Sequence, residues 1–180
     1  AIYVHFGWSP QAQSDISKYK INNINGISED GTTFWRVKDK SAPHNAVTST
    51  KKIMESAKSK RYRTTSTSSS VLNYVTDEIL LEDGIEANEV TIPHSQLQTV
   101  KYEYDSEQKV YERYARNKEQ KDWTTGNMVT TKNIIITFCD NYELTDSENK
   151  GRQGLKNTGT FDGYYITNGK AIKIKCIKES

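Results

Sequence analysis

The sequence has little cysteine and no long apolar run. Two cysteines among 180 residues exclude a small scaffold held by several disulfides and every zinc site with four cysteine ligands. No stretch approaches the roughly 18 consecutive apolar residues of a membrane-spanning helix, and no signal-peptide pattern opens the chain. Apolar residues make up only 34%, but 11 tyrosines, 3 tryptophans and 4 phenylalanines provide bulky side chains for a core. Composition therefore predicts a soluble globular chain of one domain, or of two small ones.

The common catalytic and metal motifs are also absent. The sequence contains no glycine-rich nucleotide loop and none of the HExxH, CxxC or GxSxG motifs. Its three histidines, His5, His44 and His94, stand far apart, so a metal or general-base role needs partners brought by the fold. Residues 140–151 are acidic but lack the alternating ligands and central glycine of a calcium loop. We therefore predict no metal and no cofactor, and an enzyme is the less favoured class.

The formal net charge of +2 is unevenly distributed. Residues 36–63 contain nine basic residues against two acidic ones, a net charge of +7. Residues 77–112 contain ten acidic residues against two basic ones, a net charge of −8. The basic segment is either a surface for a polyanion or a solvated outer face. Because it lacks the interleaved aromatic residues of a single-strand groove, we favour the solvated face and predict no nucleic-acid partner.

The first part of the chain alternates short strands with helices. Residues 2–6 are a predicted buried strand, and residues 32–37 are a second one. Ser9-Pro10 predicts a helix start, with the hydroxyl as N-cap and the proline at the first helical position, and the helix should run toward Lys18. A second helix is predicted from about Thr48 to Lys60. Its apolar face would be formed by Val47, Thr50, Ile53, Met54 and Ala57.

The chain then passes through a polar segment into predicted strands. Residues 64–70 are seven consecutive hydroxyl residues, which bury nothing and should form a surface loop. Residues 89–92 are a predicted strand, and residues 100–104 and 110–115 alternate in the manner of a hairpin.

Two further signals come from the last third of the chain. Residues 134–139 are its most apolar run and should form a central strand that is covered on both faces. Asn168-Gly169 is typical of a type I′ turn and predicts a hairpin of residues 159–166 and 170–177.

These patterns together predict an α+β fold. An N-terminal α/β domain with two helices is expected at residues 1–85, followed by a mostly antiparallel, β-rich domain at residues 86–180. Cys139 and Cys176 each fall in a predicted strand of the second domain, where they are either buried free thiols or, less favoured, a disulfide.

His44 is the polar residue of greatest interest. It follows a proline in the loop before the second helix, with Asn45 adjacent and Arg36 one short strand and loop away. Loops at the ends of strands and helices are where a rigid scaffold presents functional groups. Arg36, His44 and Asn45 are therefore a candidate cluster for catalysis or ligand binding. In the structural alternative, His44 and Asn45 cap backbone groups at the start of the helix and Arg36 pairs with an acid.

Several segments of the chain resemble one family. In the first part they are His5 to Ala12, Phe34-Trp35-Arg36 and Ala42-Pro43-His44-Asn45. In the second part they are Tyr111-Glu112-Arg113, Asp122 with Thr124-Thr125-Gly126, Asn133 to Ile136 and Gly159 to Lys170. In this order they resemble the YerB-like lipoproteins of Gram-positive bacteria, a two-domain family of unknown function. We add His5 and Arg113, which lie in these segments, to the candidate ligand-binding residues.

The resemblance implies an extracytoplasmic protein that is tethered to the cell membrane by a lipid anchor absent from this chain, and it implies no known reaction. The leading hypothesis is a cell-envelope binding or structural module for a polar ligand, with an envelope polymer or a protein as partner. The alternative is an envelope hydrolase that uses His44 with a carboxylate brought by the fold.

The resemblance also implies an internal fragment. Family members typically carry a lipobox cysteine and a long N-terminal portion, and they continue into a further β hairpin at the other end. Residues 170–177 are therefore expected to be an exposed sheet edge that promotes self-association.

Overall fold

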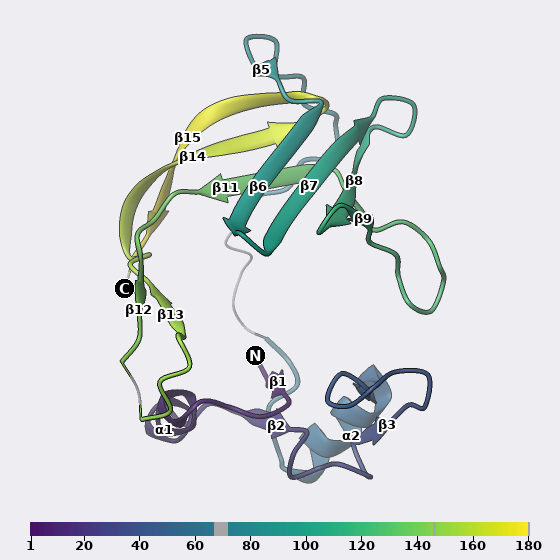
Figure 1. Ribbon diagram of the computed structural model, residues 1–180, viewed down its shortest axis with the longest axis vertical. Coiled ribbons are helices and arrows are strands. Elements are labelled where there is room, and N and C mark those ends of the chain that lie inside the picture. The colour runs from purple at the N-terminus through teal and green to yellow at the C-terminus, as the bar shows by residue number, and fades with distance from the viewer. Residues whose placement is uncertain (67–71, 146, 180) are drawn as a thin grey trace. The chain divides into compact units, whose positions relative to one another are not determined.

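A computed structural model describes residues 1–66, 72–145 and 147–179 (Figure 1). The chain divides into two compact units. Unit 1 comprises residues 1–73 and 145–152, and unit 2 comprises residues 74–144 and 153–180. The helices of the described residues belong to unit 1, and most strand pairs are antiparallel, which confirms the predicted α+β class.

Both helices of unit 1 begin at a serine cap. The first helix, α1 (Pro10–Lys18), follows Ser9, whose side chain accepts a backbone N–H of the first turn, as the Ser9-Pro10 pattern predicts. The second helix, α2 (Thr50–Ser59), follows Ser49, which caps it in the same way. The second helix therefore lies within its predicted range and starts two residues later.

Four short strands complete unit 1. They are β1 (Tyr3–His5), β2 (Asn23–Asn25), β3 (Phe34–Arg36) and β4 (Ala46–Thr48). The β1 strand pairs parallel with β2, and β3 pairs antiparallel with β4. Of these, β2 and β4 are absent from the sequence prediction, because a strand of three residues is too short to show a period of two.

The core of unit 1 is small. Ile24, Phe34 and Ala57 are buried, and they are surrounded by the partly buried residues Ile2, Val4, Ile53 and Tyr62. The predicted burial of residues 2–6 is wrong in part, since Tyr3 and Phe6 are 50% and 40% exposed. Met54, which was expected on the buried side of α2, is exposed as well.

Unit 2 contains two larger antiparallel sheets (Figure 1). The first has the strand order β10-β8-β7-β6, with β9 paired to β8. Its strands are β6 (Glu89–Ser95), β7 (Gln98–Asp105), β8 (Val110–Ala115), β9 (Lys118–Glu119) and β10 (Thr130–Thr131). The pairing of β7 with β8 confirms the hairpin that the sequence predicted there.

The second sheet has the order β11-β14-β15-β5. Its strands are β5 (Ile85–Glu86), β11 (Asn133–Thr137), β14 (Gly159–Thr167) and β15 (Lys170–Lys178). Asn168 and Gly169 join β14 to β15 with φ angles of 49° and 73°, which confirms the predicted turn. Within the acidic segment 140–151, part of the chain is also a strand, because β12 (Asn141–Glu143) pairs with β13 (Gln153–Leu155).

The prediction of a central, doubly covered strand at residues 134–139 is wrong. Within the described chain β11 bonds only to β14, so it is an edge strand. Ile134 is 6% exposed and faces the core, whereas Ile135 is 53% exposed on the opposite face. The apolar run therefore reflects one buried face and an outer face on which Ile135 lies opposite Tyr165 of β14.

The core of unit 2 lies between its two sheets. Val90 and Tyr111 come from the first sheet, and Ile134, Ile166 and Ala171 come from the second. The Tyr111 hydroxyl donates a 3.1 Å hydrogen bond to the buried carbonyl of Ala87, so the one polar atom of this ring is satisfied inside the core.

The last strand is open along most of one edge. Lys170 and Ala171 of β15 pair with β5, while residues 172–178 have no strand on that side among the residues described. The predicted exposed edge is thus present over most of β15, and self-association stays a prediction. The predicted hydroxyl-rich loop is described only at 64–66, because residues 67–71 lie outside the described ones. Neither described helix is long and apolar enough to cross a bilayer.

Candidate functional site

The fold brings Arg36 and Asn45 together. The Arg36 side chain donates 3.0 Å hydrogen bonds to the side-chain oxygens of Asn45 and Asp30, and it forms an ion pair with Asp30. Its guanidinium also lies 4.6 Å from the centre of the Phe6 ring. Asn45 in turn donates to the carbonyl of Val37. Arg36 is therefore held by an acid, an amide and a ring, as in the structural alternative.

His44 is not part of that network. It is exposed in the turn before β4, where its backbone N–H donates to Ser41. In the described part of the chain its ring makes no hydrogen bond or ion pair with Arg36, Asn45 or any carboxylate. The helix that follows is capped by Ser49, so His44 does not serve as its cap either.

His5 lies in a row of three aromatic rings at the start of the chain, which we call the ring row: Tyr3, His5 and Trp8. The Tyr3 and His5 rings are stacked at 4.7 Å with an angle of 13° between their planes, and the Trp8 ring follows His5 at 5.7 Å. Tyr3 and Trp8 are 50% and 44% exposed. Val4, which points to the other side of β1, packs against the core.

The His5 ring has a polar neighbour at each nitrogen. Its Nδ1 donates a 2.8 Å hydrogen bond to the carbonyl of Gly7, and its Nε2 lies 3.2 Å from Oδ1 of Asn23. Asn23 belongs to β2, which pairs in parallel with the strand that carries Tyr3 and His5. The ring row is therefore rigid at its centre and accessible at both ends.

Glu29 is a polar residue that the sequence prediction missed. Its carboxylate accepts hydrogen bonds from the hydroxyls of Thr33 and Ser56, and Lys60 lies 3.1 Å from its other oxygen. Burial raises the pKa of this carboxyl, but the hydrogen bonds and the Lys60 charge outweigh it and hold the pKa below its ordinary value. Both hydroxyls bond one carboxylate oxygen, and the ion pair with Lys60 is at the other, so Glu29 links α2 to the segment before β3.

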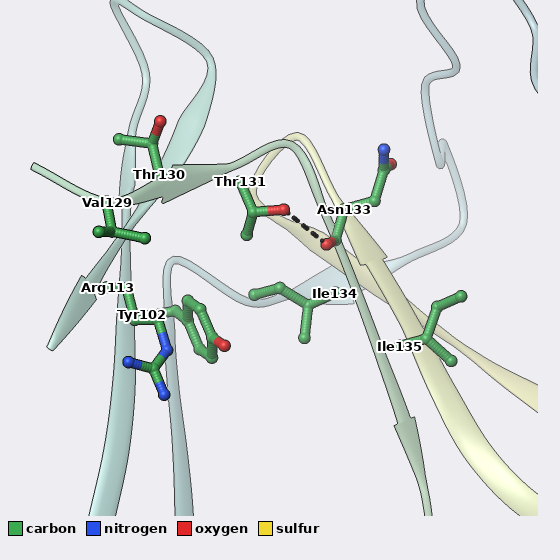
Figure 2. Close-up of a pocket in the computed structure, with 8 residues that line it drawn as sticks. All are labelled: Tyr102, Arg113, Val129, Thr130, Thr131, Asn133, Ile134 and Ile135. Carbon is green, nitrogen blue, oxygen red and sulfur yellow. Dashed lines mark hydrogen bonds between the residues drawn. The ribbon is translucent and has the colours of Figure 1, made fainter. Parts of the chain in front are cut away.

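Arg113 borders a cavity of about 220 Å³ in unit 2. On β8 it is the register partner of Tyr102 on β7, and Figure 2 shows its guanidinium beside the Tyr102 ring. The remaining wall comes from Val129 to Thr131 and Asn133 to Ile135, where the chain passes from one sheet to the other. The Thr131 hydroxyl donates to the backbone carbonyl of Asn133 and fixes this crossing (Figure 2).

The outer face of the same sheet carries a separate charged network. Lys101 forms an ion pair with Glu103 on β7, and the Tyr114 hydroxyl donates to Glu112 on β8. The carboxylates of Glu103 and Glu112, together with desolvation, raise the pKa of Tyr114 to about 12. A phenol with this pKa stays protonated at neutral pH, and its contacts are those of a solvated sheet face.

Metal-binding groups are scattered. Within residues 1–66, 72–145 and 147–179, no three histidine, cysteine, aspartate or glutamate side chains gather into a possible metal site. Cys139 and Cys176 are free, and the Thr137 hydroxyl donates to Sγ of Cys176 at 3.0 Å.

The structure thus distributes the five candidate residues over four places. Arg36 and Asn45 form one network, His5 lies in the ring row, and Arg113 borders the cavity, while His44 is isolated and exposed. The sequence prediction did not include Tyr102, which lines the cavity, or the exposed rings of Tyr3 and Trp8 among the candidate residues. For Arg113 a sequence signal existed, because it follows Tyr111 by two residues and therefore shares its face.

Comparison with known proteins supports the family assignment. Residues 1–63 match the N-terminal domain, and residues 90–180 the C-terminal domain, of a family described as a protein of unknown function (DUF3048). The chain is 25% identical over 173 residues to a Bacillus subtilis (strain 168) protein named "Putative lipoprotein YerB", covering 96% of this chain and 51% of the relative. The crystal structure of the YerB protein from Bacillus subtilis superimposes with a TM-score of 0.76 at 26% identity, over 99% of this chain and 58% of that one.

This chain therefore spans about half the length of the curated relative that it matches. The family resemblance seen in the sequence is confirmed, and both of its domains are matched in the expected order. The chain belongs to the YerB-like DUF3048 family, whose function is unknown.

Proposed function

We propose that this protein is an extracytoplasmic binding module, tethered to the membrane through a lipid anchor, which holds a polysaccharide of the cell envelope against the ring row. The lipid anchor is the attachment that the name of the Bacillus relative describes. The observation that carries the binding role is the rigid ring row of Tyr3, His5 and Trp8, whose end rings are exposed.

Exposed aromatic rings are costly to leave in water and mark binding surfaces when they are grouped. Ordering a side chain on binding costs free energy, so rings that are already held in place bind more tightly. The hydrogen bond of His5 to Gly7, the contact of its other ring nitrogen with Asn23 and its stacking on Tyr3 supply this order before a ligand arrives. Sugar rings present faces of C–H groups that stack on aromatic rings through weak contacts, and such contacts add up along a polymer.

A hydrolase centred on His44 has less support. General acid–base catalysis needs a histidine or carboxylate within hydrogen-bond reach of its partners. In the described part of the chain His44 has no carboxylate partner. The Glu29 carboxylate, which is 13% exposed, is engaged by Thr33, Ser56 and Lys60. Binding without catalysis therefore fits the geometry better.

Sedimentation with protein-free, insoluble envelope polysaccharide tests the proposal. The wild-type chain should pellet with the polymer, and Tyr3→Ala or Trp8→Ala should weaken binding by about tenfold, the factor for a loss of about 1.4 kcal/mol. Matched controls are Tyr19→Ala and Trp35→Ala, which remove rings that are 64% and 41% exposed in the same unit but outside the ring row. Equal losses in the controls, or no pelleting of the wild type, would contradict the proposal.

A further inference from the structure

Arg113 lies on the face of its sheet that builds the core of unit 2. Along β8, Tyr111 and Arg113 alternate with Glu112 and Tyr114, and alternate residues of a strand point to the same face. Tyr111 is fully buried at 0% exposure, and Tyr102, the register partner of Arg113, packs against the same core. A half-buried arginine thus stands where the pattern of the strand calls for an apolar residue.

No acid neutralises this arginine in the part of the chain that the structure describes. Its side chain makes no hydrogen bond and no ion pair there. The acids of the adjacent register position, Glu103 and Glu112, face the other side of the sheet and bond Lys101 and Tyr114. A guanidinium stays charged at every physiological pH, and a partly buried charge without a partner is unfavourable.

The side chain with this unpaired charge borders a cavity. The 220 Å³ space beside Arg113 is smaller than the roughly 300–1,000 Å³ of sites that enclose a drug-sized ligand. Arg113 is the charged member of the residues that line it, and Val129 and Ile134 provide an apolar wall. Figure 2 shows the Tyr102 ring and its hydroxyl between Arg113 and Ile134 in this view.

We propose that this cavity binds a carboxylate that carries a short apolar group, with Arg113 as a two-pronged donor to the carboxylate oxygens. The planar guanidinium fork matches a carboxylate in geometry, and such paired bonds are stronger than bonds between neutral groups. One positive charge balances one negative charge, which favours a carboxylate over a doubly charged phosphate. The ligand is either a small organic acid or the acidic end group of a larger molecule. This site is in unit 2 and does not depend on the ring row of unit 1.

Titration of the 180-residue chain, followed through backbone amide resonances, tests the proposal. Propionate should shift the resonances of Tyr102, Arg113 and Ile134 in a saturable way. Propionamide, which has the same shape without the charge, should not. An N-acetylated dipeptide with a free carboxyl end represents the acidic end group of a larger molecule. If it binds more tightly than propionate, the ligand is such an end group and not a small organic acid. Stronger binding of inorganic phosphate than of either carboxylate would overturn the proposal.

Two substitutions test whether Arg113 is the residue that binds the carboxylate. Arg113→Gln should weaken propionate binding by about tenfold or more, since it removes a charge-assisted pair of hydrogen bonds. The matched control is Arg116→Gln, which removes a neighbouring exposed arginine whose guanidinium bonds Gln98 at 2.9 Å, and it should change the affinity by less than about twofold. Equal losses in both variants would show attraction by general surface charge and overturn the proposal.

A second variant keeps the test decisive if Arg113→Gln folds poorly. Arg113→Met replaces an unpaired charge with an apolar side chain of similar length, so the melting temperature of the free chain should rise. Propionate should raise the melting temperature of the wild type, because a ligand that binds only the folded state stabilises it, and should leave that of Arg113→Met unchanged. A Met variant that is still stabilised by propionate would overturn the proposal.

Discussion

The Ser56 hydroxyl of α2 donates a 2.7 Å hydrogen bond to the Glu29 carboxylate, 27 residues earlier in the chain. The same carboxylate oxygen accepts the Thr33 hydroxyl at 2.5 Å, and Lys60 Nζ lies 3.1 Å from the other oxygen. The Glu29 side chain is 13% exposed. One acid therefore joins the second helix to the segment before β3.

Glu29→Gln should destabilise unit 1. The substitution removes the charge and turns an amide N–H toward hydroxyl donors, so we expect the opening free energy of α2 to fall by about 1–3 kcal/mol. Hydrogen–deuterium exchange of the α2 amides measures this local free energy. The control is Glu55→Gln, whose carboxylate is 52% exposed and lies 3.6 Å from Lys52, and it should cost less than about 0.5 kcal/mol. Similar costs in both variants would show that the Glu29 contacts are not stabilising.

The stability of unit 1 should also decline in acid. Burial raises the pKa of Glu29, but the bonds from Thr33, Ser56 and Lys60 outweigh it, and the pKa lies below the ordinary value of 4.5. A carboxyl whose pKa is lowered by folding contributes stability that is present above its unfolded pKa and is lost as the pH falls through its folded pKa. Stability should therefore fall at pH values below about 4.5, and the fall should be smaller in Glu29→Gln. Denaturant unfolding of unit 1, monitored at a series of pH values, checks this, and parallel curves for the two proteins would contradict it.

The two faces of the edge strand β11 should respond differently to truncation. Ile134→Ala removes a side chain that is 6% exposed in the core of unit 2, and it should lower the free energy of unfolding by about 2–4 kcal/mol. Ile135→Ala removes one that is 53% exposed on the outer face, and it should cost less than about 1 kcal/mol. Urea unfolding of both variants gives the comparison. A cost at Ile135 as large as that at Ile134 would mean that something covers the outer face.

Part of this fold could be predicted from the sequence because it depends on interactions between residues that are close together in the chain. A serine followed by proline at the first helical position sets the start of α1 without help from the rest of the chain. Asn168-Gly169 sets the β14–β15 turn because these residues adopt the positive φ angles that the turn requires. The family resemblance followed in the same way from ordered local segments, and the comparisons confirm it.

The strand pairing and the surroundings of the candidate residues depend on contacts between segments that are far apart in the sequence. The parallel pairing of β1 with β2 depends on which strands meet in the folded chain. The same is true of β11, because an apolar run has the same composition at the edge of a sheet as at its centre. Arg36, Asn45 and Arg113 were recognisable as candidates from the sequence. Only the tertiary structure gave Arg36 an acid and an amide, and placed Arg113 beside a cavity without an acid from the described residues. Ion pairing depends on distances that strand order and register set.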